Sequence, residues 1–220
     1  MTNKPQNINQ LTTSLVPKNS RVLDLGCGNG ALGEILQKKF NCQVIGVDSN
    51  SKLLSVAKRK LNKIILGNLD ENETLYKIAK EPEFDVIFAS AILEHLQKPE
   101  LVVKKLSKRL KKNGFFLITL PNVAFWQIRL NLLFGKFGYT HSGILDKTHL
   151  HFFTIKSATA FLKEECHLSV HKLEYEFPPT PIIHKIARLI PRFGQKLENS
   201  LHKNFPNLFA YQIAIVAKPE

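Results

Sequence analysis

The chain has 220 residues, 44% of them hydrophobic, so it is long and apolar enough to bury one sizeable core. Residues 1–14 are polar, no apolar run reaches membrane-spanning length and the three cysteines are scattered. We therefore expect a reduced, cytoplasmic protein without a signal peptide or a transmembrane helix. The formal net charge of +13 favours an anionic partner (nucleic acid, a membrane surface or a phosphorylated substrate), unless it merely reflects a lysine-rich composition.

An N-terminal arm over residues 1–20 precedes a strand, a glycine loop and a helix, which together occupy residues 21–40. The strand is a short apolar run, and the helix shows apolar residues at helical spacing. Between them, Gly26, Gly28 and Gly30 alternate, and glycine permits a positive φ and a close approach of the backbone to a ligand. A strand, a glycine loop and a helix N-terminus in succession predict a cradle for a ligand.

Asp24 decides which ligand this cradle favours. Residues 28–33 match the dinucleotide pattern G-x-G-x-x-G, which is weak evidence alone. A carboxylate two residues before Gly26 would be a poor neighbour for a pyrophosphate and a good one for an ammonium group. S-adenosylmethionine has the ammonium group and lacks the pyrophosphate. The alternative is an ordinary strand–loop–helix corner whose glycines serve only the turn.

A second strand over residues 43–48 ends at Asp48, about twenty residues beyond the glycine loop. A carboxylate at that distance can accept hydrogen bonds from the hydroxyls of a ribose. The alternative role for Asp48 is to cap the next helix, for which Ser49, Asn50 and Ser51 are rival caps. Its position after the loop favours the ribose.

Strands and helices then alternate up to residue 121. We expect helices over residues 51–61, 71–80 and 99–110, and strands over residues 63–66, 84–89 and 115–120. This alternation is typical of an open, mostly parallel sheet with helices on both faces.

The second half of the chain is less regular. Residues 122–150 mix aromatic and basic side chains, and a helix capped by Thr154 runs to about residue 165. A sixth strand over residues 168–176, a basic and broken helical pair over residues 182–203 and a buried last strand over residues 209–217 follow. No linker separates domains, so we expect a single domain.

Five motifs follow one another in the first 122 residues: L-D-L-G-C-G-N-G, V-I-G-V-D, F-D-V-I-F-A, L-E-H-L and K-N-G-F-F-L-I-T-L-P-N. Together they resemble the class I S-adenosylmethionine-dependent methyltransferases. The resemblance implies an α/β, Rossmann-like fold with a seven-stranded, mostly parallel sheet, whose last strand is antiparallel and lies beside the fifth. Residues 21–121 would bind the cofactor, residues 122–150 would form a substrate lid, and residues 151–220 would complete the sheet, with a basic helical insert over 178–206.

The resemblance also assigns the contacts to S-adenosylmethionine. Its methionyl part would lie against Asp24, Gly26, Gly28 and Gly30, and its ribose against Asp48. Asn68 and Leu69 would flank the adenine, although relatives often carry aspartate where this chain has Asn68. Ser90 and Ala91 would close the pocket after the fourth strand.

The second half narrows the resemblance through P-N-V-A-F-W-Q-I-R-L-N-L-L-F-G-K-F and G-I-L-D-K-T-H-L-H-F-F-T. These stretches look like a bacterial subgroup that methylates glycans, lipopolysaccharide or small molecules, which implies an oxygen or nitrogen acceptor, lipid-linked glycans included. The same region is similar to the methionine-biosynthesis protein W family, which implies instead an accessory protein that binds an acyltransferase. RNA methylation is a third reading, although no RNA-binding module is recognisable.

An oxygen or nitrogen acceptor can require a base near neutral pH, a task that suits histidine. We expect His149 to be that base and Asp146 to orient it, since their three-residue spacing would put both on one side if that segment is helical. For His95, in L-E-H-L, we expect a structural role. Asp146, His149 and His151, with His141, could also be read as metal ligands, but methyl transfer requires no metal and we expect none.

Two surfaces have open interpretations. The aromatic segment 122–150 either packs on the domain as a lid or faces a membrane together with the basic residues 182–203. In the second case the protein would lie at the inner face of the membrane, with its basic side chains on anionic headgroups. The alternative for residues 182–203 is that they cover the sheet or a second copy of the chain.

Overall fold

The computed structural model describes residues 8–178 and 191–220. Its strands are β1 (Arg21–Leu25), β2 (Gln43–Asp48), β3 (Lys63–Leu66), β4 (Phe84–Ser90), β5 (Leu110–Pro121), β6 (Leu168–Glu176) and β7 (Gln212–Pro219). Its α-helices are α1 (Ile8–Ser14), α2 (Ala31–Phe40), α3 (Ser51–Ala57), α4 (Asn72–Ala79), α5 (Pro99–Ser107), α6 (Trp126–Leu133), α7 (Ile155–Ala160), α9 (Pro191–Asn204) and α10 (Pro206–Phe209). A 3-10 helix, η1 (Leu93–His95), and a π-helix, η2 (Phe161–Glu165), complete the elements.

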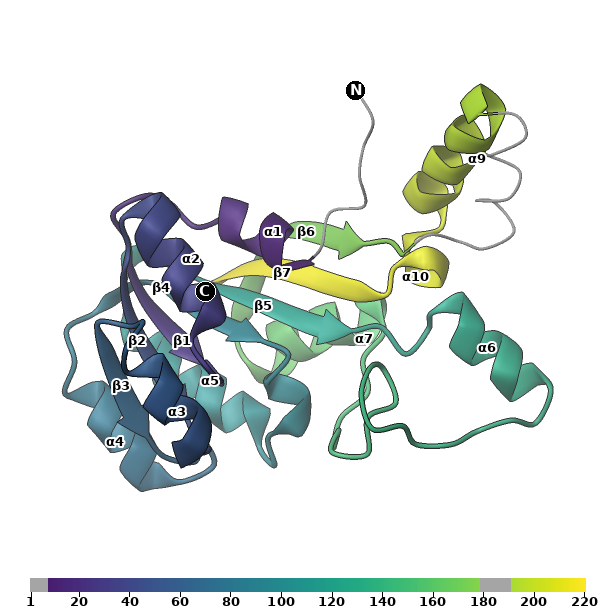
Figure 1. Ribbon diagram of the computed structural model, residues 1–220. Coiled ribbons are helices and arrows are strands. Elements are labelled where there is room, and N and C mark those ends of the chain that lie inside the picture. The colour runs from purple at the N-terminus through teal and green to yellow at the C-terminus, as the bar shows by residue number, and fades with distance from the viewer. Residues whose placement is uncertain (1–7, 179–190) are drawn as a thin grey trace.

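The strands form one seven-stranded sheet in the order β3-β2-β1-β4-β5-β7-β6 (Figure 1). Neighbours from β3 to β5 run parallel, whereas β7 is antiparallel to both β5 and β6. The expected Rossmann-like sheet is therefore confirmed, including an antiparallel last strand beside the fifth.

The central strands are buried on both faces because nearly all their residues are apolar. Side chains of one face, such as Leu23, pack against α4, α5 and α7, and those of the other, such as Val22, pack against residues of α2 and α3. Within residues 8–178 and 191–220, no helix combines the length and the apolarity needed to cross a membrane.

Some element boundaries differ from the expected ones. The helix expected over residues 99–110 ends at Ser107, because Leu110 already pairs with Phe84 of β4. The last strand begins at Gln212 rather than at residue 209, because the short helix α10 takes the preceding residues. The N-terminal arm over residues 1–20 contains the helix α1 (Ile8–Ser14).

The order of the strands creates the site. The chain moves outward from β1 to β2 and β3, then returns to β4 on the other side of β1. At such a reversal the loops after β1 and β4 leave on opposite faces, which opens a crevice at the carboxyl ends of the strands. The residues predicted to bind the cofactor lie in or just after the last residues of β1, β2, β3 and β4, at this edge.

Asn122 fixes the base of the segment 122–150, which Figure 1 shows reaching away from the sheet together with α6. Its side chain is fully buried and donates hydrogen bonds to the backbone oxygens of Asn207 (3.0 Å) and Ala210 (2.8 Å). Its Oδ1 accepts a hydrogen bond from the Ala124 N–H at 3.1 Å. The segment is thus anchored to the chain that leads into β7.

Candidate functional site

The glycine loop after β1 has the backbone that the sequence predicts. Gly26, Gly28 and Gly30 have φ angles of 68°, 54° and 74°, values that L side chains rarely adopt. A Cβ at Gly26 would lie 2.8 Å from Cδ1 of Ile92, whereas one at Gly28 would meet nothing within 4 Å in the described part of the chain. Gly26 therefore packs under the segment after β4, and Gly28 borders open space.

Asp48 holds this loop from the end of β2. Its Oδ2 accepts a hydrogen bond from the Gly28 N–H, and its Oδ1 accepts one from the Asn50 N–H, both at 2.8 Å. The cap of α3 is Asn50, whose Oδ1 accepts from the N–H groups of Lys52 and Leu53. The alternative of Asp48 as helix cap is thus wrong, and its carboxylate lies beside the glycine loop.

Asp24 lies at the end of β1, two residues before Gly26, with one buried carboxylate oxygen that has no partner among the described residues. The residue is only 2% exposed, and the oxygen without a hydrogen-bond partner is Oδ2. Burial raises the pKa of Asp24 to about 7, and the nearby charge of Asp48 adds to the increase. Such a carboxylate is suited to a cationic ligand group, which would favour its ionised form.

The remaining predicted cofactor contacts follow β3 and β4. Asn68 is exposed and its Oδ1 accepts from the Asp70 N–H at 3.1 Å, while Leu69 is buried in the core. Ser90 Oγ lies 3.1 Å from Thr119 Oγ1. Ala91 has a φ of 49°, unusual for a residue with a side chain, and its N–H donates to both oxygens of Thr119. Sequence reasoning could not detect this strained turn.

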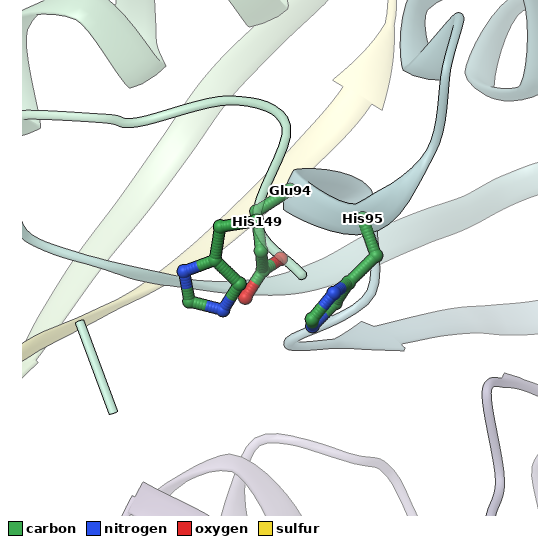
Figure 2. A group of neighbouring side chains, drawn as sticks. All are labelled: Glu94, His95 and His149. Carbon is green, nitrogen blue, oxygen red and sulfur yellow. The ribbon is translucent and has the colours of Figure 1, made fainter. Parts of the chain in front are cut away.

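A cluster of three polar side chains follows the strained turn. Figure 2 shows the carboxylate of Glu94 between the imidazole rings of His95 and His149. Each residue offers one ligand atom, and these three atoms all lie within 4.8 Å of one another. The ring centroids of His95 and His149 are 4.7 Å apart. The sequence predicts a catalytic role for His149 and a structural one for His95. It assigns no role to Glu94, whose signals are its place in the motif L-E-H-L and its acidic side chain in an apolar stretch.

Glu94 is fully buried, and neither oxygen of its carboxylate has a hydrogen-bond partner within the described ranges. Burial raises the pKa of Glu94 to about 7. The two imidazole rings, in contrast, both have hydrogen-bond partners. His149 Nδ1 lies 3.0 Å from the backbone oxygen of Ile144, and His95 Nδ1 lies 3.2 Å from the backbone oxygen of Thr148. Burial lowers the pKa of His149, which favours its neutral form.

Residues 146–149 are not helical, so the condition under which Asp146 and His149 would share one side is not met. The segment is a turn, in which Asp146 Oδ1 accepts hydrogen bonds from the Thr148 N–H (2.8 Å) and the Thr148 hydroxyl (2.7 Å). The group that orients His149 is the Ile144 carbonyl. Of the four side chains weighed as metal ligands, only His149 joins the cluster; His151 Nε2 lies 3.0 Å from the Leu96 oxygen.

The segment 122–150 is packed at its base and exposed beyond it. Phe125, Ile144 and Leu145 form a small apolar core, against which Tyr211 packs. Between them and α6 lies a cavity of about 510 Å³. Further out, apolar side chains such as Leu133 (78% exposed) face solvent.

The surface expected to contact a membrane is only partly described, because residues 182–190 lie outside the described ranges. The rest belongs to α9, which carries exposed Lys196 and Lys203 and is followed by α10. Within it, His202 stacks on Phe177 with ring centroids 4.1 Å apart, which ties the helix to the end of β6.

Comparisons with known proteins agree with this geometry. A family model described as a methyltransferase domain matches residues 4–165. The ubiquinone biosynthesis O-methyltransferase of Pelagibacter ubique is 36% identical over 107 residues, covering 48% of this chain and 43% of that protein. The malonyl-[acyl-carrier protein] O-methyltransferase of Priestia megaterium is 31% identical over 129 residues, covering 56% and 45%. The chain spans less than half the length of these two relatives.

A solved structure shares the fold over nearly the whole chain. It is a SAM-dependent methyltransferase from Archaeoglobus fulgidus, with a TM-score of 0.59 at 20% identity, covering 96% of this chain and 94% of that one.

Proposed function

Because the chain belongs to the methyltransferase domain family, we propose that it transfers a methyl group from S-adenosylmethionine to an oxygen or nitrogen of a small-molecule or glycan acceptor. The two relatives described above are O-methyltransferases, named for ubiquinone biosynthesis and for malonyl-[acyl-carrier protein], which supports an oxygen acceptor, while a pavine N-methyltransferase that is 32% identical over 99 residues keeps nitrogen open. The family resemblance extends the acceptors to glycans, lipid-linked ones among them.

The observation that carries the proposal is the pair of carboxylates at the glycine loop. Asp24 has a buried oxygen without a partner among the described residues, which suits the ammonium group of the methionyl part. Asp48 presents its carboxylate beside Gly28, where a ribose would offer hydroxyls. Gly28 leaves open space for the approach of a ligand. These residues fit S-adenosylmethionine, and Asn68, Leu69, Ser90 and Ala91 would border its adenine end and the mouth of the pocket.

When bound, S-adenosylmethionine supplies a methyl group that is activated by its sulfonium. The chain's own contribution is to hold the acceptor in line and to exclude water. His149, whose ring lies beside the Glu94 carboxylate (Figure 2), is the residue proposed to accept the proton of the acceptor. Asp146 would act on the same cluster indirectly, because it holds Thr148, which contacts His95.

Calorimetric titration of the purified chain with S-adenosylhomocysteine and, separately, with NAD tests the cofactor. Binding of S-adenosylhomocysteine alone is expected, and binding of NAD alone would contradict the proposal. With the cofactor established, His149→Asn should lower turnover of a methylated acceptor while cofactor affinity stays nearly unchanged. Unchanged turnover would assign His149 a structural role.

A further inference from the structure

We propose that Glu94, His95 and His149 form a binding site for one divalent transition-metal ion. Each side chain offers one ligand atom, and the three atoms all lie within 4.8 Å of one another. Figure 2 shows a nitrogen of each ring turned to the side of the Glu94 carboxylate. Bonds of about 2.0–2.2 Å to a metal require the three atoms to approach somewhat further, which small side-chain rotations can provide.

The fold itself brings the three ligands together. Glu94 and His95 belong to η1, whereas His149 comes from the segment that follows α6. The backbone oxygen of Glu94 accepts hydrogen bonds from the N–H groups of Leu150 (2.8 Å) and His151 (3.1 Å). The loop that carries His149 is therefore fixed against η1 by the backbone, independently of the side chains in the cluster.

Hydrogen bonds select the ring nitrogens that can bind a metal. The Nδ1 atoms of His95 and His149 face the backbone oxygens of Thr148 and Ile144, and a carbonyl only accepts, so both Nδ1 atoms carry the proton. Each neutral ring then keeps a lone pair on Nε2. Metal-binding histidines are typically held in this way, with the other nitrogen donating to a carbonyl or carboxylate.

Glu94 supplies the charge that such a site needs. Both oxygens of its fully buried carboxylate lack a hydrogen-bond partner in the described part of the chain. An uncompensated carboxylate in the interior is costly unless it is protonated or meets a cation. The two neighbouring rings are not that cation in their neutral forms, whereas a divalent ion among the three groups would neutralise the carboxylate directly.

The donor set indicates the class of ion. Two imidazole nitrogens and one carboxylate oxygen suit Mn²⁺, Fe²⁺, Co²⁺ or Zn²⁺, whereas Mg²⁺ and Ca²⁺ prefer oxygen ligands throughout. Three protein ligands also leave coordination positions open. The ion's role in the reaction rests on the proposed function. An acceptor hydroxyl bound at an open position would have a lowered pKa and would lose its proton to water. His149 would then be a ligand rather than the proton acceptor.

The test is a titration of the untagged full chain, stripped of metal with a chelator, with Co²⁺, whose visible absorption reports nitrogen ligation. We expect saturation at a single ion per chain. Glu94→Gln and His149→Asn should each weaken binding at least about tenfold. His171→Asn, at an exposed position of β6, is the matched control and should leave binding unchanged.

Thermal unfolding and binding of S-adenosylhomocysteine check that each variant is folded, and His95→Asn replaces any variant that is not. Absence of saturable binding, or equal affinity in the original chain and the ligand variants, would overturn the metal site. Mg²⁺ binding without Co²⁺ binding would overturn the ligand class. If the chain binds S-adenosylhomocysteine but no Co²⁺, the proposed function stands and the metal site is refuted. If it binds Co²⁺ but no S-adenosylhomocysteine, the metal site stands and the proposed function is refuted.

Discussion

The Gly28 N–H donates a hydrogen bond to Asp48 Oδ2 at 2.8 Å, which joins the loop after β1 to the end of β2. The same carboxylate accepts from the Asn50 N–H through Oδ1. Each carboxylate oxygen can accept more than one hydrogen bond, so Asp48 can hold the loop and still receive the hydroxyls of a ligand. Asp48 thus holds the loop in place and is also the residue proposed to accept hydrogen bonds from the ribose hydroxyls.

We predict that Asp48→Ala weakens S-adenosylhomocysteine binding by about 1–3 kcal/mol, the cost of losing hydrogen bonds to a charged group. Calorimetric titration measures the loss. Asp48→Asn keeps one oxygen acceptor for the loop and should lose less affinity. Equal affinity of the folded Ala variant and the original chain would refute the ribose assignment.

The first two glycines of the loop, Gly26 and Gly28, should respond differently to alanine. Gly28→Ala adds a Cβ in open space, so the positive φ is its main cost, about 1–2 kcal/mol of stability, while the methyl group obstructs the ligand. Gly26→Ala has the same strain and also a contact of 2.8 Å with Ile92, so it should destabilise more. Urea unfolding and ligand titration separate the effects. Equal destabilisation by both would contradict the packing of Gly26 under Ile92.

Asp24 predicts a pH dependence of both stability and binding. Its pKa is about 7 in the fold and near 3.8 in the unfolded chain, so the unfolded chain loses this proton first as the pH rises. The contribution of Asp24 to the free energy of unfolding is therefore greatest below about pH 4 and falls as the pH rises to about 7. Above that pH the free energy of unfolding is lower by up to about 4 kcal/mol. The charged group of Asp48 and the thiol of Cys27 are the titratable neighbours.

A ligand with an ammonium group next to Asp24 should bind more tightly as the pH rises from about 5 to 7 and should release a proton on binding. Calorimetry at pH 6 in buffers of different ionisation enthalpy detects that proton. Asp24→Asn should remove the proton release, weaken binding and stabilise the ligand-free chain above pH 7. A variant that keeps the pH dependence would exclude Asp24 as its source.

Asn122→Ala should destabilise the chain by about 2–4 kcal/mol. It leaves the oxygens of Asn207 and Ala210 and the N–H of Ala124 without their partner in a buried place. Chemical denaturation measures the loss. Gln127→Ala, on α6 rather than at the anchored base of the segment, is the control and should change stability little. A neutral Asn122→Ala variant would contradict its anchoring role.

The parts of the site that could be predicted from the sequence are those in which cause and effect lie close together along the chain. The glycine loop and Asp48 follow from local patterns at the ends of strands, and the alternation of elements already implies that these strands form a mostly parallel sheet. Glu94 and His149 could not be paired, because their proximity depends on a backbone hydrogen bond between Glu94 and Leu150. The sequence could not show that the Asp146 carboxylate bonds Thr148, because that choice depends on the tight turn that brings Thr148, two residues later, within reach.

The hydrogen bond to Thr148 gives Asp146 an indirect role, which the last prediction tests. The Thr148 hydroxyl donates to Asp146 Oδ1 at 2.7 Å, so its oxygen is free to accept from His95 Nδ1 at 3.1 Å. Asp146→Ala and Thr148→Val should each weaken Co²⁺ binding by about tenfold, the typical effect of removing a group that orients a ligand. Because both act through one chain of hydrogen bonds, the double variant should be little weaker than either single variant. Asp146→Asn, which keeps the oxygen acceptor, should rescue most of the affinity. Additive losses would show that Asp146 does not act on His95 through Thr148.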